Sequence, residues 1–346
     1  MQTLSVIEKK LTPLKELRVG FIGAGRHSTA NLYPAFALTG VPIVAIAERN
    51  PERAREAATR GYAPQIFADH HALLRNSRLD AVVVSLAPEL QIAVVEDCIR
   101  AGVGVFVEKP LGFNADSAQR IAQLALAHRS PVMLGFMKRF APAYVRLKNM
   151  IGADNELGSP SSYVCVFGCA PWKPDMTHAD LLIRAAVHLV DLVRSLFGDV
   201  AEVSAELSST AGAMTIAATF RHTSGVVGSL TFVLSGSWAR ETEELTVICD
   251  RGTARIFDLV RVEVWGAGSV SPAANPWADL SESAKIFGTT NSPESGTLRD
   301  IYLRGFAGEM AHFVSVLRGD QELTASAKDN VSTMQTCDRI LHAISS

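Results

Sequence analysis

The chain has 346 residues, of which 48% are hydrophobic and 20% charged, and its formal net charge is −2. This length and apolar content predict about two folded domains, each with a core of its own. The nearly neutral charge argues against a nucleic-acid-binding protein, because binding to a phosphate backbone depends on clustered Lys and Arg side chains.

The N-terminal residues 1–16 contain no apolar stretch long enough for a signal peptide. No later segment supplies the roughly 18 uninterrupted apolar residues of a membrane helix. We therefore expect an N-terminal extension over 1–16 and a cytoplasmic protein without a membrane partner. The five cysteines have scattered spacings that do not predict a disulfide framework, and we expect Cys165 and Cys169 to be buried small side chains rather than metal ligands.

Residues 17–140 alternate short β-branched runs with helical stretches. The expected strands are RVGFIG, IVAIAE, AVVVSL, VGVFVE and PVMLGF. Continuous apolar strands separated by helices are typical of a parallel sheet covered on both faces. This segment is predicted to be a doubly wound α/β domain of the Rossmann, dinucleotide-binding type.

Residues 141–346 follow a different pattern, with one helical segment near 179–197 and then several strands joined by turns such as HTSG and DRGT. Consecutive strands with tight turns favour antiparallel pairing, so we expect an α+β domain with an open, largely antiparallel sheet. The stretch 266–300 is rich in Gly, Ser, Pro and Asn and is predicted to be a long surface loop or lid. Two closing helices are expected to pack on the first domain or on the sheet.

The segment LRVGFIGAGRHSTANLYPAF predicts a strand, a glycine-rich turn and a helix. Gly23 would permit the tight bend, and Gly25 would let the backbone approach a pyrophosphate at the start of the helix. Ser28 stands where the third glycine of the G-x-G-x-x-G pattern is usual. The next strand ends in Glu48, which would accept hydrogen bonds from ribose hydroxyls and disfavour a 2′-phosphate. This favours NAD, although Arg49 directly after the acid leaves NADP possible.

The stretch VFVEKPLGF places two opposite charges and a proline at the end of an apolar strand. In an open parallel sheet, ligands bind beyond the carboxyl ends of the strands, so Glu108 and Lys109 are expected to lie near a nicotinamide. A lysine in that position can act as a general acid or base. Pro110 would fix the turn, and a cis peptide bond before it is one way to do so.

Over almost its whole length the chain resembles the Gfo/Idh/MocA oxidoreductases, named for glucose-fructose oxidoreductase and inositol dehydrogenase. The resemblance rests on GFIGAGRHS, AERNPERA, DAVVVSLAPELQ, VFVEKPLG, VMLGFMKRFAPAY and VHLVDLVRSLFGD. It implies that Glu108 contacts the nicotinamide ribose and that Lys109 is the acid–base catalyst and a substrate ligand. The implied cofactor-binding residues are Gly23, Gly25, Arg26, His27, Glu48, Arg49, Leu86, Glu108 and Lys109. The second domain would then carry the substrate and oligomer surfaces, in a dimer or tetramer.

The predicted helix near 179–197 places Arg184, His188 and Asp191 beside its apolar stripe at steps of four and three residues, so these side chains can touch. By resemblance His188 is the second catalytic residue, and Asp191 could orient it. Arg184 stands where relatives commonly carry an aspartate. We expect it either to bind an anionic group of the substrate or to pair with Asp180 or Asp191.

Two lesser differences from the family pattern lie in SLAPELQ. Leu86 and Ala87 replace a usual Thr-Pro pair, and Gln91 replaces a common histidine.

These observations favour an NAD(P)-dependent dehydrogenase or reductase that acts on a secondary alcohol or ketone of a sugar, cyclitol or sugar acid, without a metal. Two alternatives stay open from the sequence. One is a redox-neutral enzyme of the same fold that uses bound NAD to cleave glycosides. The other is a nucleotide-binding regulator that has lost turnover, for which Arg184 would be the sign.

Overall fold

The computed structural model describes residues 16–60, 65–237, 241–266, 284–288 and 299–345. Residues 1–15 of the expected extension over 1–16 and most of the expected loop over 266–300 lie outside these residues. None of the helices in the described ranges is long and apolar enough to cross a membrane. The chain divides into two compact units. The first comprises residues up to Glu108, Gln123–Met133 and Met310–Ser326, and the second comprises Lys109–Ala122, Leu134–Glu309 and the segment from Ala327 onward. The proposed domain limits of 17–140 and 141–346 stay a prediction.

A six-stranded sheet forms the centre of the dinucleotide-binding fold. Its order is β3 (Gln65–Phe67), β2 (Ile43–Ala47), β1 (Val19–Ile22), β4 (Ala81–Val84), β5 (Gly104–Val107) and β6 (Val132–Leu134). The pairs that join β3 through β5 are parallel. Every residue of β1, β4 and β5 is buried, as the apolar runs require of strands covered on both faces. The predicted doubly wound α/β architecture is confirmed, with β3 as an additional short edge strand.

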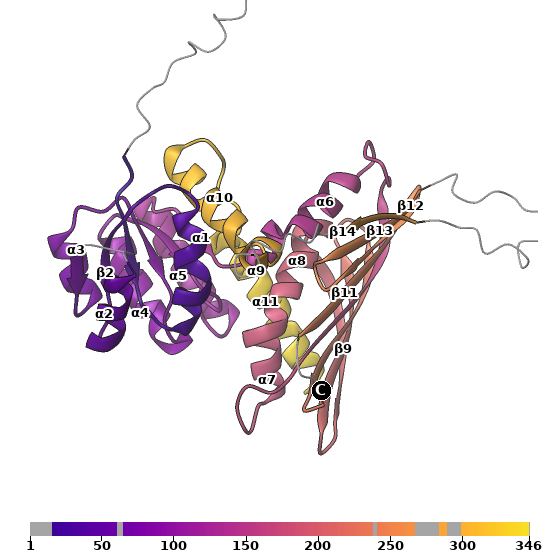
Figure 1. Cartoon of the computed structure of the whole chain (residues 1–346). Coiled ribbons are helices and arrows are strands. Elements are labelled where there is room, and N and C mark those ends of the chain that lie inside the picture. The colour runs from indigo at the N-terminus through magenta and orange to yellow at the C-terminus, as the bar shows by residue number, and fades with distance from the viewer. Residues whose placement is uncertain (1–15, 61–64, 238–240, 267–283, 289–298, 346) are drawn as a thin grey trace, which may run out of the picture. The chain divides into compact units, whose positions relative to one another are not determined.

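Helices follow the strands in alternation (Figure 1). They are α1 (Tyr33–Ala37), α2 (Pro51–Thr59), α3 (His70–Asn76), α4 (Pro88–Arg100), α5 (Ala115–His128) and, late in the chain, α10 (Phe306–Arg318). Local sequence explains where two of them begin. Asn50 accepts from the backbone N–H groups of Glu52 and Arg53 at the start of α2, and Asp69 accepts from that of Ala72 at the start of α3.

The second unit is built on an eight-stranded sheet. Its order is β14 (Lys285–Gly288), β13 (Arg261–Gly266), β12 (Gly252–Phe257), β11 (Thr242–Cys249), β7 (Pro160–Cys169), β10 (Val227–Ser235), β9 (Ala213–His222) and β8 (Val200–Ser209). Its helices are α6 (Pro142–Met150), α7 (His178–Asp180), α8 (Val187–Phe197), α9 (Arg299–Leu303) and α11 (Ala327–Ala343), with a 3₁₀ turn at Met137–Phe140. Helices α8 and α11 pack against each other on one face of the sheet, as Figure 1 shows.

The sheet is largely antiparallel, as predicted, but one central pair is not. Strands β7 and β10 run parallel over eight residue pairs, from Val227↔Ser162 to Leu234↔Cys169. The reason is connectivity, because the α7–α8 segment and strands β8 and β9 separate β7 from β10 in the chain. Strand β7 therefore lies between β10 and β11, which follow each other in the chain but do not pair.

The helical segment near 179–197 is also more varied than predicted. It begins as α7, continues as a π-helical turn over Leu181–Ala186 and ends as α8. A π-helical turn inside a helix is rare and occurs frequently at functional sites. Arg184 lies within this turn, and His188 and Asp191 lie in the α-helical part that follows.

Candidate active site

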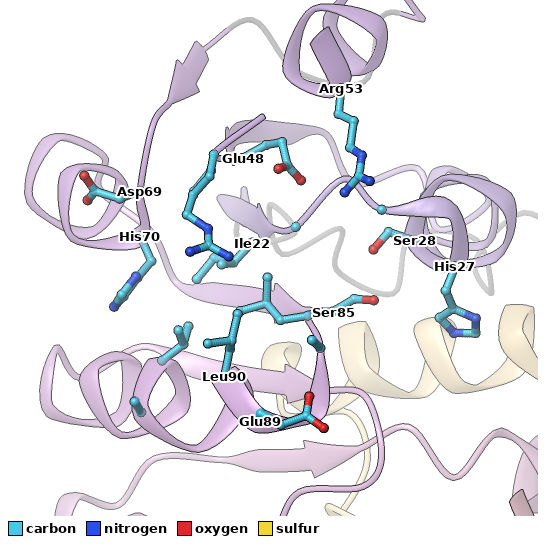
Figure 2. A pocket seen from close by; sticks show the side chains of 18 of the residues that line it. Ile22, His27, Ser28, Glu48, Arg53, Asp69, His70, Ser85, Glu89 and Leu90 are labelled. Atoms are coloured by element: carbon cyan, nitrogen blue, oxygen red, sulfur yellow. The ribbon is translucent and has the colours of Figure 1, made fainter. Parts of the chain in front are cut away.

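A cavity of about 650 Å³ lies in the first unit, at the carboxyl ends of β1, β2 and β4. This volume is within the usual range for small-molecule and cofactor sites. Seven of the residues predicted to contact a cofactor line it together: Gly23, Gly25, Arg26, His27, Glu48, Arg49 and Leu86. Figure 2 shows His27 and His70 at opposite ends of the view, with Glu48, Ser85 and Leu90 between them.

Gly23 and Gly25 of the turn differ in what a side chain would meet at each position. Gly23 has φ of +102°, and a Cβ there would stand 2.2 Å from the backbone oxygen of Ser85. It is therefore required by the fold itself. A Cβ on Gly25 would meet no atom of the described chain within 4 Å. Gly25 instead leaves its side of the cavity open, as a closely approaching phosphate requires.

The buried hydroxyl of Ser28 follows the turn at the beginning of the helical segment. Its Oγ has no hydrogen-bond partner within the described residues, and the residue lines the cavity. A buried hydroxyl costs free energy unless a partner satisfies it. A pyrophosphate oxygen at this helix start would supply that partner.

Glu48 is held by the backbone on both of its carboxylate oxygens. Oε2 accepts from the N–H of Ala24 at 2.8 Å, and Oε1 accepts from the N–H of Asn50 at 2.9 Å. The acid therefore connects the glycine-rich turn to the end of β2, and its position in the cavity wall is fixed. Each oxygen keeps further acceptor capacity for ribose hydroxyls.

Arg53 is a cavity residue that sequence reasoning missed. It comes from the first turn of α2 and, in Figure 2, reaches towards Ser28. The segment AERNPERA could have indicated it. Asn50 caps a helix that begins directly after the acidic strand end, so the first residues of that helix lie close to the same cavity. Ser85, Ala87 and Glu89 were missed as well; the first two lie between β4 and α4, and Glu89 lies in the first turn of α4.

Glu108 is the last residue of the first chain segment of the first unit and is nearly fully buried. Its Oε1 lies 3.0 Å from Nε2 of His27, which belongs to the glycine-rich turn. The side-chain amide of Gln91 donates to the backbone carbonyl of Glu108 at 2.8 Å. Gln91 was noted only as a difference from the family pattern, and the structure shows that it fixes the peptide that leads to Lys109.

Lys109 begins the second unit. The peptide bond between Lys109 and Pro110 is cis, as the sequence suggested. Nζ of Lys109 donates to the backbone carbonyl of Arg184 at 2.6 Å, so the π-helical turn holds the lysine amine. The structure therefore brings two of the predicted site residues of the second unit into direct contact.

The Arg184 side chain is 28% exposed and pairs with Asp180, with its Nε 3.1 Å from Oδ1. Its guanidinium also stands 5.2 Å from the ring centre of Phe113. Asp180 pairs in addition with Lys173 at 3.0 Å. Burial would raise the pKa of Asp180, but hydrogen bonds from Thr177 and Lys173 hold it at about 2. Of the two expected partners for Arg184, the structure shows the pair with Asp180.

His188 is 7% exposed and meets the ring of Phe136 edge-on, at 6.3 Å between ring centres. Asp191, one turn further on, is fully buried. Its two oxygens accept from Nε and Nη2 of Arg139 at 2.7 and 2.6 Å, and Oδ1 also accepts from Thr333 at 3.1 Å.

Burial lowers the pKa of the Arg139 guanidinium, but the attraction of Asp191 and, to a lesser extent, Asp329 outweighs this and raises the pKa above its ordinary value. These contacts favour a structural role for Asp191 as an anchor of α8. Its expected contact with a substrate stays a prediction.

Comparison with known families decides the classification. Residues 17–136 match the model of the oxidoreductase family with an NAD-binding Rossmann fold, GFO_IDH_MocA, and residues 144–255 match the GFO/IDH/MocA C-terminal domain. The chain belongs to the Gfo/Idh/MocA family. The membership predicted from the sequence is confirmed, and the first domain is an NAD-binding domain.

Individual relatives agree with the family assignment. Inositol 2-dehydrogenase 4 of Saccharopolyspora erythraea is 29% identical over 303 residues, which cover 80% of this chain and 88% of that enzyme. An inositol 2-dehydrogenase of Acidothermus cellulolyticus is 33% identical over 185 residues, about half of each chain. The crystal structure of a dehydrogenase from Chromobacterium violaceum superposes with a TM-score of 0.83 over 95% of both chains at 20% identity, which shows that the fold is shared.

The cavity fits an NAD molecule on its own chemistry. It has a glycine turn that leaves room for a phosphate, a buried hydroxyl at a helix start, and a fixed carboxylate at the end of the second strand. These are the three groups that a dinucleotide's pyrophosphate and ribose need in a doubly wound fold. Gly25, Ser28 and Glu48 are the residues that would hold it.

Proposed function

We propose that the chain is an NAD-dependent dehydrogenase or reductase that interconverts a secondary alcohol and a ketone on a sugar, cyclitol or sugar acid. The observation that carries this proposal is the continuity of the chain from Glu108 to Lys109. Glu108 is tied to the glycine-rich turn through His27, and the next residue presents a lysine amine held by the carbonyl of Arg184. A cofactor-binding element and an acid–base group are thus separated by one peptide bond.

The proposed chemistry needs one proton acceptor beside the hydride acceptor that bound NAD supplies. In the oxidative direction Lys109 takes the hydroxyl proton of the substrate as the carbon gives up its hydride, and in the reductive direction it returns that proton. His188 lies on the helix that begins directly after the π-helical turn holding Lys109, and it serves as the second proton-transfer or hydroxyl-binding group.

The substrate class follows from what surrounds the lysine. Nζ of Lys109 touches the backbone of Arg184, and we propose that a substrate bound at that amine also reaches the Arg184 side chain. A guanidinium offers a planar set of donors suited to a carboxylate or phosphate. We therefore favour a sugar or cyclitol bearing an acidic group, for which Arg184 would exchange its pair with Asp180.

For the cofactor, Glu48 supports NAD over NADP. A carboxylate fixed by two backbone N–H groups cannot turn away from an incoming 2′-phosphate. Arg49 and Arg53 line the same cavity and are the residues that would oppose this preference.

A substrate panel tests the proposal. Neutral cyclitols, neutral sugars, uronates and aldonates are each incubated with NAD and separately with NADP, and the absorbance of the reduced nicotinamide is followed at 340 nm. We expect reduction of NAD with at least one acidic substrate, and a slower rate with NADP. A protein that binds NADH yet reduces neither cofactor with any substrate would contradict a dehydrogenase function.

A further inference from the structure

At the rim of the cavity, three side chains of the first unit converge on one point. His70 and His71 open α3, and Asp97 lies on α4. Nε2 of His70 is 3.0 Å from Oδ2 of Asp97, and Nδ1 of His71 is 3.8 Å from the same oxygen. All three potential ligand atoms lie within 4.8 Å of one another. From these contacts we propose that the chain has a binding site for a divalent transition metal of the zinc class between α3 and α4.

The distances match those that such an ion requires. Bonds from zinc to imidazole nitrogen and carboxylate oxygen are about 2.0 to 2.2 Å, so neighbouring ligand atoms of a tetrahedron lie about 3.4 Å apart. The two nitrogen–oxygen distances of 3.0 and 3.8 Å lie on either side of that value. Small side-chain rotations, rather than movement of the helices, would therefore complete the geometry.

The donor set selects the class of metal. Two imidazoles and one carboxylate suit Zn²⁺, Ni²⁺ and Cu²⁺, whereas Mg²⁺ and Ca²⁺ prefer oxygen ligands alone. The side chain of His71 is 56% exposed and that of Asp97 is 34% exposed, so water can reach the remaining coordination position.

The two histidine rings are unusually close to each other, which also supports a shared metal ion. Their rings are 4.0 Å apart between centres with 35° between planes, although consecutive helical residues do not normally face each other. Both rings have a nitrogen directed at the same oxygen of Asp97, at 3.0 and 3.8 Å. Its other oxygen faces Arg100 at 3.5 Å, which leaves Oδ2 for the metal but places a positive charge nearby.

The site would lie at the rim of the dinucleotide cavity. His70 and Asp69 line that cavity, as do Glu89, Leu90, Ala93 and Val94 of α4. A metal held between His70, His71 and Asp97 would link the start of α3 to α4, both of which form the cavity wall. It takes no part in the proposed hydride chemistry, and its existence does not depend on that function.

Metal titration of the tag-free, chelator-stripped protein tests the proposal. Isothermal titration with ZnCl₂ should reveal one saturable site per chain, and MgCl₂ should give no comparable heat. His71→Ala should weaken zinc binding at least tenfold, and Arg100→Gln should tighten it by removing the nearby cation. His128→Ala, at an exposed position on α5, is the matched control and should bind zinc as the parent does.

A second measurement separates binding from a mere surface contact. A metal that binds only the folded state raises the unfolding temperature once its free concentration exceeds its dissociation constant, and the rise grows with the logarithm of that concentration. Zinc should raise it by several degrees in the parent and the His128 variant, and not in the folded His71→Ala protein. Equal zinc affinity in the parent and His71→Ala would overturn the proposal, and so would a parent that binds no zinc. In either case the pair of His70 and Asp97 would be only a helix-to-helix hydrogen bond.

Discussion

Glu108 and Lys109 are consecutive residues with different surroundings. The carboxylate of Glu108 faces His27 of the glycine-rich turn, while the amine of Lys109 faces the carbonyl of Arg184, 75 residues later in the chain. The backbone between them is fixed by Gln91 from one side. A substitution at Lys109 should therefore affect chemistry and leave the cofactor cavity intact.

The first prediction follows from this separation. Lys109→Ala should reduce turnover by about a hundredfold or more, the usual contribution of general acid–base catalysis, and change NADH affinity only a few-fold. Nicotinamide fluorescence measures the affinity, and steady-state kinetics with the best substrate measures turnover. Lys148→Ala, on α6, is the control. Loss of NADH binding with turnover preserved would assign Lys109 to the cofactor rather than to the reaction.

The second prediction concerns Arg184, whose guanidinium pairs with Asp180 and faces Phe113. If it recognises a substrate anion, the parent should prefer acidic over neutral versions of the same sugar in kcat/KM. Arg184→Met should lose most of that preference while it keeps the fold and NADH binding. A single well-placed charged contact is worth several-fold to about a hundredfold in such a ratio.

The competing role for Arg184 gives a different result. If it only braces the start of the helical segment through Asp180, the parent and Arg184→Met should treat neutral and acidic substrates alike. The variant would then show a lower unfolding temperature as its main effect.

At the scale of single elements, His222 joins three segments of the second unit. From β9 its Nδ1 donates to the carbonyl of Gly198 after α8 at 2.7 Å, and its Nε2 accepts from the hydroxyl of Tyr163 on β7 at 2.9 Å. Tyr163 in turn stacks on Phe197, with ring centres 4.6 Å apart. This arrangement fits a neutral imidazole. Burial lowers the pKa of His222 below its ordinary value of 6.5.

A pH-dependent stability follows from that shift. Because the pKa is lower in the folded than in the unfolded chain, the unfolded chain binds more protons as the pH falls below about 6.5, and folding loses stability. His222→Gln should remove this contribution, so its loss of stability between pH 7.5 and 5.5 should be smaller than that of the parent. One group contributes at most about 1.4 kcal/mol per pH unit.

Denaturant unfolding at several pH values measures this slope. His128→Gln, at an exposed position on α5, is the control and should keep the parent's slope. An unchanged slope in His222→Gln would mean that other groups cause the pH dependence.

Local patterns predicted much of the fold and of the cofactor site. The apolar runs identified five of the six parallel strands, and the glycine turn and Glu48, predicted from their places at strand ends, line one cavity. The roles predicted for Glu108 and Lys109 stay predictions. Contacts between residues distant in the chain could not be predicted in this way. Arg139 and Asp191 are 52 residues apart, and nothing in either local sequence indicates that they form a buried pair. The parallel register of β7 and β10 was missed for the same reason.

At the scale of the whole molecule, the two units divide the proposed chemistry between them. The cavity that fits a dinucleotide is lined by residues of the first unit, and Lys109, Arg184 and His188 belong to the second. The chain first passes from one unit to the other between Glu108 and Lys109. Binding of the cofactor and selection of the substrate should therefore respond to different sets of substitutions.

The eight-stranded sheet exposes apolar side chains on one face of its central strands. Val164 on β7 is 48% exposed and Ile248 on β11 is 44% exposed, although both lie in central strands. Val164 pairs with Ser229 of β10 and Thr246 of β11, and directly paired residues point to the same face of a sheet. The two residues paired directly with Val164 are thus small and uncharged, and the next charged groups on the same face, Glu244 and Arg255, neutralise each other in an ion pair.

The last prediction is that the chain is a homo-oligomer that associates through this face. A stable interface buries about 1,200 to 2,000 Å² in total, an area that several adjacent strands can supply. Light scattering coupled to size exclusion should give the parent a mass that is a multiple of 37.1 kDa. Val164→Asp should shift the mass towards that of the monomer, because two copies would bring unpaired carboxylates together in a desolvated contact.

Leu126→Asp, at an 80% exposed position on α5, is the matched control and should keep the parent's mass. NADH binding by the Val164 variant should persist, since the cavity is formed within the first unit. A monomeric parent, or a Val164→Asp protein with the parent's mass, would show that this face does not join subunits.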